Sequence, residues 1–200
     1  MIVAITGAAS GIGLATAHLL ASRGAKLSLA DLSSDALYKH AEEIRSRYKT
    51  DVITSAIDVR RYDEVGRWIE ETKQHFGQLN GAANLAGVIP KSIGLKGISE
   101  QDPEEWDFVL GVNLTGVMHC LKAQLPQISE GGAIVNASSI AGLIGRANNA
   151  SYTARSVECI AFTRCDADLY LKQTRCRWYD AHRRERGRLS QCTSQLYMSR

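Results

Sequence analysis

The sequence from residue 2 to residue 13 reads IVAITGAASGIG, and this stretch decides the fold. A short apolar run with β-branched residues ends in a glycine-rich turn, and an apolar stretch, LATAHLLASRG, follows it. The order predicts a strand, a tight turn and a helix. Glycines at such a turn leave no side chain in the way, so a pyrophosphate can approach the backbone N–H groups and the positive end of the helix dipole. A tight turn with close helix packing is the alternative interpretation.

The same rhythm continues along the chain, because short β-branched runs alternate with amphipathic stretches. Such alternation is typical of βαβ units around a parallel sheet. It predicts an α/β fold with a doubly wound, mainly parallel, Rossmann-like sheet in three α/β/α layers, incomplete at the C-terminal end. The expected strands are residues 2–6, 27–30, 52–57, 79–86 and 133–138, and the clearest helices are residues 63–76, 103–125 and 151–171.

The helix expected over 63–76 has the clearest period of 3.6 residues. Its apolar face is formed by Val65, Trp68, Ile69, Thr72 and Phe76. Asp63 is the expected N-cap. Trp68 and Phe76 are interpreted as core residues rather than ligand contacts.

An acidic residue follows the second expected strand. Asp31 lies 20 residues after Gly11, where a carboxylate can accept hydrogen bonds from both ribose hydroxyls of an adenosine. A 2′-phosphate at that position would meet like charge, so NAD is expected rather than NADP. The alternative role for Asp31 is a helix N-cap, since LSSDAL follows it.

Together these residues resemble the short-chain dehydrogenase/reductase family, whose cofactor turn has the pattern T-G-x-x-x-G-x-G. The match begins at Thr6. Ile57-Asp58-Val59 resembles the acidic pair after the third strand, which contacts adenine in the family, and Asn84-Leu85-Ala86-Gly87 resembles the N-x-A-G turn under the cofactor. The cofactor contacts that the resemblance implies are Gly7, Ser10, Gly11, Ile12, Gly13, Asp31, Asp58, Val59, Asn84, Ala86, Gly87 and Tyr152.

Two further motifs resemble the family's catalytic residues. Asn113, within VNLTG, matches a helix asparagine that holds a proton-relay water, and IVNASSIAG followed by Tyr152 matches the fifth strand, the serine and the tyrosine. The family serine lies 13 residues before the tyrosine, which favours Ser139 over Ser138. The resemblance implies that Ser139 orients the substrate oxygen of a secondary alcohol or ketone. Tyr152 then exchanges a proton with that oxygen, while the nicotinamide exchanges a hydride with the carbon.

The sequence departs from the family at the position four residues after this tyrosine. The family pattern is Y-x-x-x-K, and here the fourth position holds Ser156. The pKa of a phenol is near 10 in water, so the family's lysine favours the phenolate, and it also binds the nicotinamide ribose. Serine carries no charge, and Arg155 is one residue early, about 100° around the helix. The alternative function is therefore a dinucleotide-binding protein with impaired or no catalysis.

The resemblance covers residues 1 to about 170, so a dinucleotide-binding domain over 1–170 and a basic tail over 171–200 are expected. No proline follows Pro126, although the family has a Pro-Gly turn and a substrate-covering segment after the tyrosine helix. A truncated or altered ending is the interpretation. The tail is expected to be solvated rather than to bind nucleic acid.

Composition limits the remaining possibilities. With 200 residues, 44% hydrophobic and 22% charged, the sequence is typical of one globular domain. No apolar run is long enough for a membrane span, so a cytoplasmic location is expected. The five cysteines lack C-x-x-C spacing and histidine partners, which predicts free thiols and no metal site. A homo-oligomer is possible through the helices near 103–125 and 151–171.

Overall fold

The computed structural model describes residues 1–142, 147–156, 161–165 and 168–172. In these residues the strands form a single sheet in the order β3-β2-β1-β4-β5-β6-β7. The first five strands in the chain pair with one another in parallel, which confirms the predicted doubly wound sheet. The bounds of the strands are β1 Ile2–Thr6, β2 Lys26–Asp31, β3 Val52–Ala56, β4 Leu79–Asn84, β5 Ile128–Asn136, β6 Ala161–Cys165 and β7 Asp168–Lys172.

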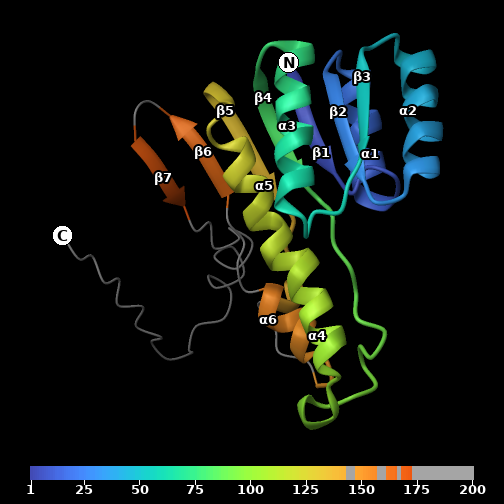
Figure 1. The fold of residues 1–200 in the computed structure, drawn as a ribbon, viewed down its shortest axis with the longest axis vertical. Helices are drawn as coiled ribbons and strands as arrows, with labels where there is room; N and C mark the ends of the chain where they lie inside the picture. Colours follow the sequence, from blue (N-terminus) through green and yellow to red (C-terminus); the bar gives the residue numbers. More distant parts are fainter. Residues whose placement is uncertain (143–146, 157–160, 166–167, 173–200) are drawn as a thin grey trace, which may run out of the picture.

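Helices cover both faces of this sheet (Figure 1). Their bounds are α1 Gly11–Ser22, α2 Ser34–Tyr48, α3 Tyr62–Phe76, α4 Pro103–Leu110, α5 Gly116–Gln124 and α6 Ala150–Ser156. Two short 3₁₀ helices, η1 Ile98–Glu100 and η3 Ile140–Gly142, and a π-helical turn, η2 Gly111–Thr115, complete the described elements. Within the described part of the chain, no helix is long and apolar enough to cross a membrane.

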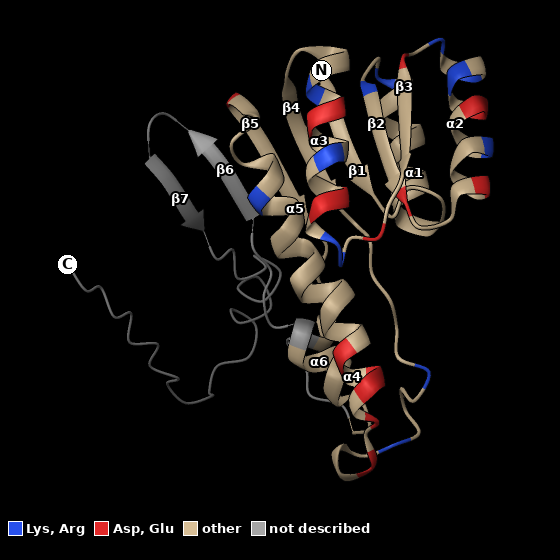
Figure 2. Ribbon diagram, in the orientation of Figure 1, with Lys and Arg blue, Asp and Glu red and all other residues tan. Residues whose placement is uncertain are grey.

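Strand β1 shows why the sheet needs two covering layers. All five of its residues are buried, and alternate side chains enter different cores. Val3 and Ile5 pack with α1 and α2, whereas Ile2 and Ala4 pack with α3 and α5. Charged residues lie mainly on the helices, the loops and the ends of strands such as β2, and strands β1 and β4 carry none (Figure 2).

Helix α3 confirms the predicted amphipathic face, since Val65, Trp68, Ile69 and Thr72 are buried. The buried polar atoms on this face are paired: Trp68 Nε1 donates to Ser28 Oγ at 2.8 Å, and Ser28 Oγ lies 2.6 Å from Thr72 Oγ1. The predicted N-cap is wrong. Arg61 occupies that position, and Asp63 lies in the first turn, where a carboxylate still interacts favourably with the helix dipole.

The predicted helix over 103–125 is present, but it contains a π-helical turn. Helix α4, η2 and α5 follow one another without a break, and Asp102 caps the start by accepting a hydrogen bond from the Glu104 N–H at 2.9 Å. In Figure 1 this rod begins beyond the carboxyl ends of the strands and runs back along the sheet. One rod therefore reaches both the site region and the core.

The predicted helix over 151–171 is wrong at residues 161–165 and 168–171, which form strands. Helix α6 covers Ala150–Ser156, and β6 and β7 form an antiparallel pair, with β6 also antiparallel to β5. Two physical reasons favour strands. The segments AFTRC and DLYLK contain residues of high β-propensity, and the outer edge of β5 offers unpaired backbone groups that a hairpin can satisfy. The boundary expected near residue 170 falls inside β7, and residues 173–200 lie outside the described residues, so that boundary stays a prediction.

Cys120 provides a test of the core between the sheet and α5. Its side chain is 1% exposed, and burial raises the pKa of its thiol to about 12. Because the thiolate is the reactive form, we expect iodoacetamide at about pH 8 to leave Cys120 unmodified in the folded protein and to alkylate it in urea. Mass spectrometry of the Cys120 peptide measures this. Equal labelling rates in folded and unfolded protein would contradict the described packing.

Candidate functional site

The glycine-rich turn connects β1 to α1 and has no room for side chains at two of its glycines. A Cβ on Gly13 would lie 2.0 Å from the Gly7 carbonyl oxygen, and a Cβ on Gly7 would lie 2.8 Å from the Ala86 nitrogen. Gly7 and Gly11 also have positive φ, +69° and +51°. A Cβ on Gly11 would have open space around it, so glycine is favoured at this position by the positive φ and not by close contacts.

The N-terminus of α1 lies at this turn. Ser10 is the N-cap residue, and its side chain makes no capping hydrogen bond. The first N–H groups of a helix have no acceptor within the helix. Together with the helix dipole, these groups at Gly11, Ile12 and Gly13 can bind a phosphate.

Asp31 ends β2 beside the turn. Its Oδ2 accepts a hydrogen bond from the Ala9 N–H at 2.9 Å, and its Oδ1 accepts one from the Ser33 N–H at 3.0 Å. These two bonds fix the orientation of the carboxylate. Ser33, not Asp31, is the N-cap residue of α2, so the alternative role as helix cap is wrong.

The segment after β3 holds Asp58 and Val59. The Asp58 carboxylate accepts hydrogen bonds from Arg60 Nε at 2.9 and 3.0 Å, which lowers the pKa of Asp58 and raises that of Arg60. The Val59 side chain is buried, and its Cγ2 would lie 2.7 Å from a Cβ on Gly116. The Asp58 side chain is 16% exposed and is held by Arg60, whereas Val59 packs against α5.

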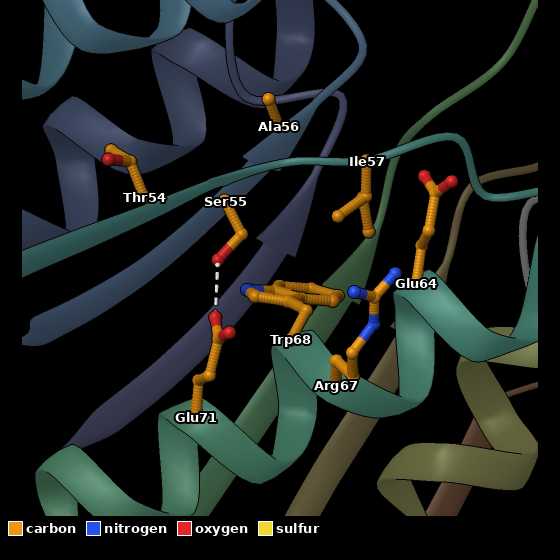
Figure 3. A pocket seen from close by; sticks show the side chains of 8 residues that line it. All are labelled: Thr54, Ser55, Ala56, Ile57, Glu64, Arg67, Trp68 and Glu71. Atoms are coloured by element: carbon orange, nitrogen blue, oxygen red, sulfur yellow. Dashed lines mark hydrogen bonds between the residues drawn. The ribbon is translucent and has the colours of Figure 1, made fainter.

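A hollow opens next to this segment, between the edge strand β3 and helix α3 (Figure 3). Glu71 accepts a hydrogen bond from Ser55 Oγ at 3.2 Å, and Glu64 Oε2 accepts one from the Asp58 N–H at 2.8 Å. Figure 3 shows Trp68 at the floor with Arg67 beside it. Of the side chains that line the hollow, Glu64 binds the 58–61 turn, and the glycine-rich turn is not part of the lining.

The turn at residues 84–87 contacts β1. Thr6 Oγ1 accepts hydrogen bonds from the Leu85 and Ala86 N–H groups at 3.1 and 3.2 Å. The Asn84 side chain is 2% exposed and binds two other buried amides, those of Gln124 and Asn136. The side chain of Asn84 therefore lies beneath the 84–87 turn, and the backbone of Ala86 lies against Gly7.

Asn113 lies in the π-helical turn and is 4% exposed. Its Oδ1 accepts from the Val88 N–H and its Nδ2 donates to the Val88 carbonyl, both at 2.7 Å. This side chain ties the rod to the segment that follows the 84–87 turn.

Ser139 and Tyr152 lie on neighbouring segments. Ser139 precedes η3, which packs against α6, the helix that carries Tyr152. The Ser139 hydroxyl accepts a hydrogen bond from the Ala141 N–H at 3.2 Å. The loop before α4 also reaches this region, since the Gly94 N–H donates to the Asn148 carbonyl at 2.7 Å.

That loop is held at its base by Glu105. Its carboxylate accepts hydrogen bonds from the Ser92 N–H at 3.2 Å, from the Ser92 hydroxyl and from Gln101 Nε2 at 3.1 Å. These hydrogen bonds, chiefly that from the Ser92 hydroxyl, lower the pKa of Glu105. The connection between β4 and α4 is therefore fixed next to the segment that precedes Tyr152.

A family model described as short chain dehydrogenase matches residues 1–175. The chain belongs to the short-chain dehydrogenase family. Two relatives named short-chain dehydrogenase/reductase ABA4 are similar: one from Botryotinia fuckeliana is 58% identical over 166 residues, and one from Pyricularia oryzae is 44% identical over 163 residues. These alignments cover 83% and 82% of this chain but 64% and 61% of the relatives, so the chain spans less than two thirds of their length.

Solved structures of this family have the same fold. A levodione reductase matches with a TM-score of 0.72 and 33% identity, covering 78% of this chain and 60% of that one. A carveol dehydrogenase from Mycobacterium avium, solved in complex with NAD, matches with a TM-score of 0.73 and 25% identity over the same shares of the two chains. A chanoclavine-I dehydrogenase from Arthroderma otae is 38% identical over 178 residues, which cover 83% of this chain and 67% of the relative.

Two residues that support the candidate site were not found from the sequence. Thr6 lies within the glycine motif, but its role as acceptor for the 84–87 turn depends on a contact between strands distant in sequence. Gln124 is 0% exposed within the apolar run LKAQLP. A polar residue at such a position is the one signal that indicates a buried hydrogen-bonding partner.

Gly13 tests the glycine packing. In Gly13→Ala the new methyl group meets the backbone of Gly7, so we expect the free energy of unfolding to fall by about 3 kcal/mol. The matched control is Gly66→Ala in α3, where a Cβ has open space and should stabilise by about 0.5–1 kcal/mol. Urea unfolding followed by circular dichroism measures both. Equal stability of the two variants would contradict the described approach of α1 to β1.

Proposed function

We propose that the chain binds NAD(H) and belongs to an oxidoreductase that transfers a hydride between the nicotinamide and a secondary alcohol or ketone. The observation that carries the proposal is the arrangement at the carboxyl ends of β1 and β2. There a glycine turn without space for side chains lies beside an Asp31 carboxylate whose two oxygens are oriented by backbone N–H groups. Family members solved with NAD support the cofactor class.

The residues present fit a dinucleotide. The backbone of residues 10–13 would hold the pyrophosphate, and Asp31 would accept hydrogen bonds from the adenosine ribose. Asp58 and Val59 would lie beside adenine, and the backbone of Ala86 and Gly87 would lie along the cofactor. Bound NAD would supply the hydride acceptor.

The chain's own residues would then act on the substrate oxygen. The Ser139 hydroxyl would orient that oxygen by a hydrogen bond, and the Tyr152 hydroxyl would exchange a proton with it. Asn113, whose side chain binds Val88, would hold the water of the proton relay. The names of relatives include ketone and alcohol substrates, levodione and carveol, which supports the same reaction class for this chain.

A second candidate function is dinucleotide binding with impaired or no catalysis. The sequence difference at Ser156 favours it, because the family lysine at that position stabilises the tyrosinate and binds the ribose. The two candidates share the cofactor site. They differ in turnover, which a substitution at residue 156 tests.

We also propose that a homo-oligomer forms through the rod of α4, η2 and α5 and through α6. Phe108, Leu114 and Met118 are exposed apolar residues on the rod, and family members pair through the corresponding helices. A cytoplasmic location and a tail without affinity for nucleic acid stay predictions.

Cofactor choice tests the role of Asp31. The carboxylate would repel a 2′-phosphate, and no Lys or Arg lies between Gly7 and His18 to compensate. We expect NADH to bind at least about tenfold more tightly than NADPH, a difference of about 1.4 kcal/mol. Asp31→Asn removes the charge and should narrow this ratio. Asp35→Asn, an exposed charge in the first turn of α2, is the matched control and should leave it unchanged. Titration calorimetry with equal affinities in the parent would refute the NAD assignment.

Turnover tests the role of position 156. In Ser156→Lys a cation returns to the position one turn after Tyr152 and favours the phenolate. We expect faster oxidation of simple secondary alcohols with NAD, by up to the roughly 10² to 10⁴ that positioned acid-base catalysis supplies, and an activity optimum at lower pH. Ser156→Met is the uncharged control. If the parent already turns over at the rate of Ser156→Lys and Tyr152→Phe abolishes it, another cation fills this role.

A further inference from the structure

Three buried amide side chains meet beneath the 84–87 turn. Gln124 Nε2 donates to Asn84 Oδ1 at 2.9 Å, and Asn84 Nδ2 donates to Gln124 Oε1 at 3.0 Å. Asn84 Nδ2 also donates to Asn136 Oδ1 at 2.8 Å. The exposed fractions of Asn84, Gln124 and Asn136 are 2%, 0% and 7%. The cluster joins the ends of β4, β5 and α5.

The hydrogen bonds fix the orientation of the Asn84 amide. Both N–H groups of Asn84 Nδ2 have an acceptor, and Oδ1 has a donor. If the Asn84 amide rotated by half a turn, its oxygen would face the oxygens of Gln124 and Asn136. A buried amide with unpaired groups is unfavourable, so Gln124 determines how Asn84 is held.

A second amide on the same rod holds the same segment of chain. Asn113 binds the N–H and carbonyl of Val88, and Gln124 binds the side chain of Asn84. The residues between these two points are Leu85, Ala86 and Gly87. Leu85 and Ala86 in turn donate to Thr6 Oγ1, and the backbone of Ala86 lies against Gly7. Side chains of the rod therefore form hydrogen bonds at both ends of the turn, with Asn84 and with Val88.

We propose that Gln124 is a positioning residue for cofactor binding: through Asn84 it fixes the backbone of the 84–87 turn against the glycine-rich turn. Gln124 itself is fully buried and does not reach the cofactor region. On the other side of the cluster, Asn136 lies three residues before Ser139, so the same amides fix the end of β5. The effect on NADH affinity rests on the function proposed above, but the effect on the turn itself does not.

Hydrogen exchange tests the turn in the full chain without cofactor. Gln124→Met keeps the length of the side chain but removes its hydrogen bonds. We expect the Leu85 and Ala86 amides to exchange at least about tenfold faster than in the parent, relative to the Leu27 amide in β2. Thr72→Val is the matched control, because it removes an equally buried hydrogen bond of the same layer, between α3 and β2. It should lower global stability without a selective effect on Leu85 and Ala86.

NADH affinity tests the consequence for binding. We expect Gln124→Met to lower the affinity for NADH by about fivefold or more, and Thr72→Val to leave that affinity unchanged.

Gln124→Glu adds a test that depends on pH. Its ionised carboxylate cannot donate to Asn84 Oδ1, whereas the protonated acid can, and burial favours the protonated form. Affinity and amide protection in this variant should therefore recover between about pH 8 and about pH 6.

The groups that face residue 124 do not titrate in this pH range. Asn84 and Asn136 are neutral amides, and burial raises the pKa of the Cys120 thiol, one turn earlier on α5, to about 12. Lys122 lies over the Tyr62 ring, at 4.3 Å from its centre. The recovery expected for Gln124→Glu thus belongs to the introduced carboxyl group, and Gln124→Met should show none.

The outcomes separate the two proposals. Selective exchange at Leu85 and Ala86 in Gln124→Met, together with weaker NADH binding, supports the positioning role. If Gln124→Met and Thr72→Val differ in neither exchange pattern nor NADH affinity, Gln124 is only structural and the inference is overturned. If the parent does not bind NADH, the proposed function fails, and the exchange of Leu85 and Ala86 alone decides the role of Gln124.

Discussion

The approach of the Gly13 backbone to the Gly7 carbonyl is the constraint on which the rest of the structure depends. No side chain separates α1 from the end of β1, so the helix begins directly above the strand. The N–H groups at the start of α1 are consequently placed at the carboxyl edge of the sheet, beside Asp31 and the 84–87 turn. Gly7 adds the second close contact, with Ala86. The proposed phosphate site, the proposed ribose acceptor Asp31 and the 84–87 turn thus lie together because two glycines allow the backbones to come into contact.

The cores and the carboxyl edge around this contact are stabilised by different interactions. Apolar side chains from β1 enter two separate cores, and this burial is the main favourable term for folding. The carboxyl edge is instead organised by polar side chains that bind backbone groups or one another, as Thr6, Asn113 and Gln124 do. Such buried polar groups are stable only when their hydrogen bonds are complete. The site is therefore sensitive to single substitutions at residues that do not contact a ligand.

Much of the fold could be predicted because its signals are local. The stripe of Val65, Trp68 and Ile69 predicts α3, and the glycine spacing predicts the turn after β1. Asp63 failed as the N-cap because the turn from Asp58 to Arg61 determines where α3 begins. The helix expected over 151–171 failed at residues 161–165 and 168–171 because pairing with the edge of β5 depends on a strand distant in sequence. Likewise, the sequence indicated Asn84 but not the burial of its side chain against Gln124.

The π-helical turn at Gly111–Thr115 changes the phase of the long rod. One extra residue in a helical turn rotates everything before it by about 100° relative to everything after it. Helix α5 can thus direct one face at the sheet, while α4, on the same rod, directs a different face toward α6. Deletion of one residue in this turn would shorten the rod by only that residue but would put it out of phase with one of its two neighbours. We therefore expect insertions and deletions to be tolerated far less in this turn than in the surface loops.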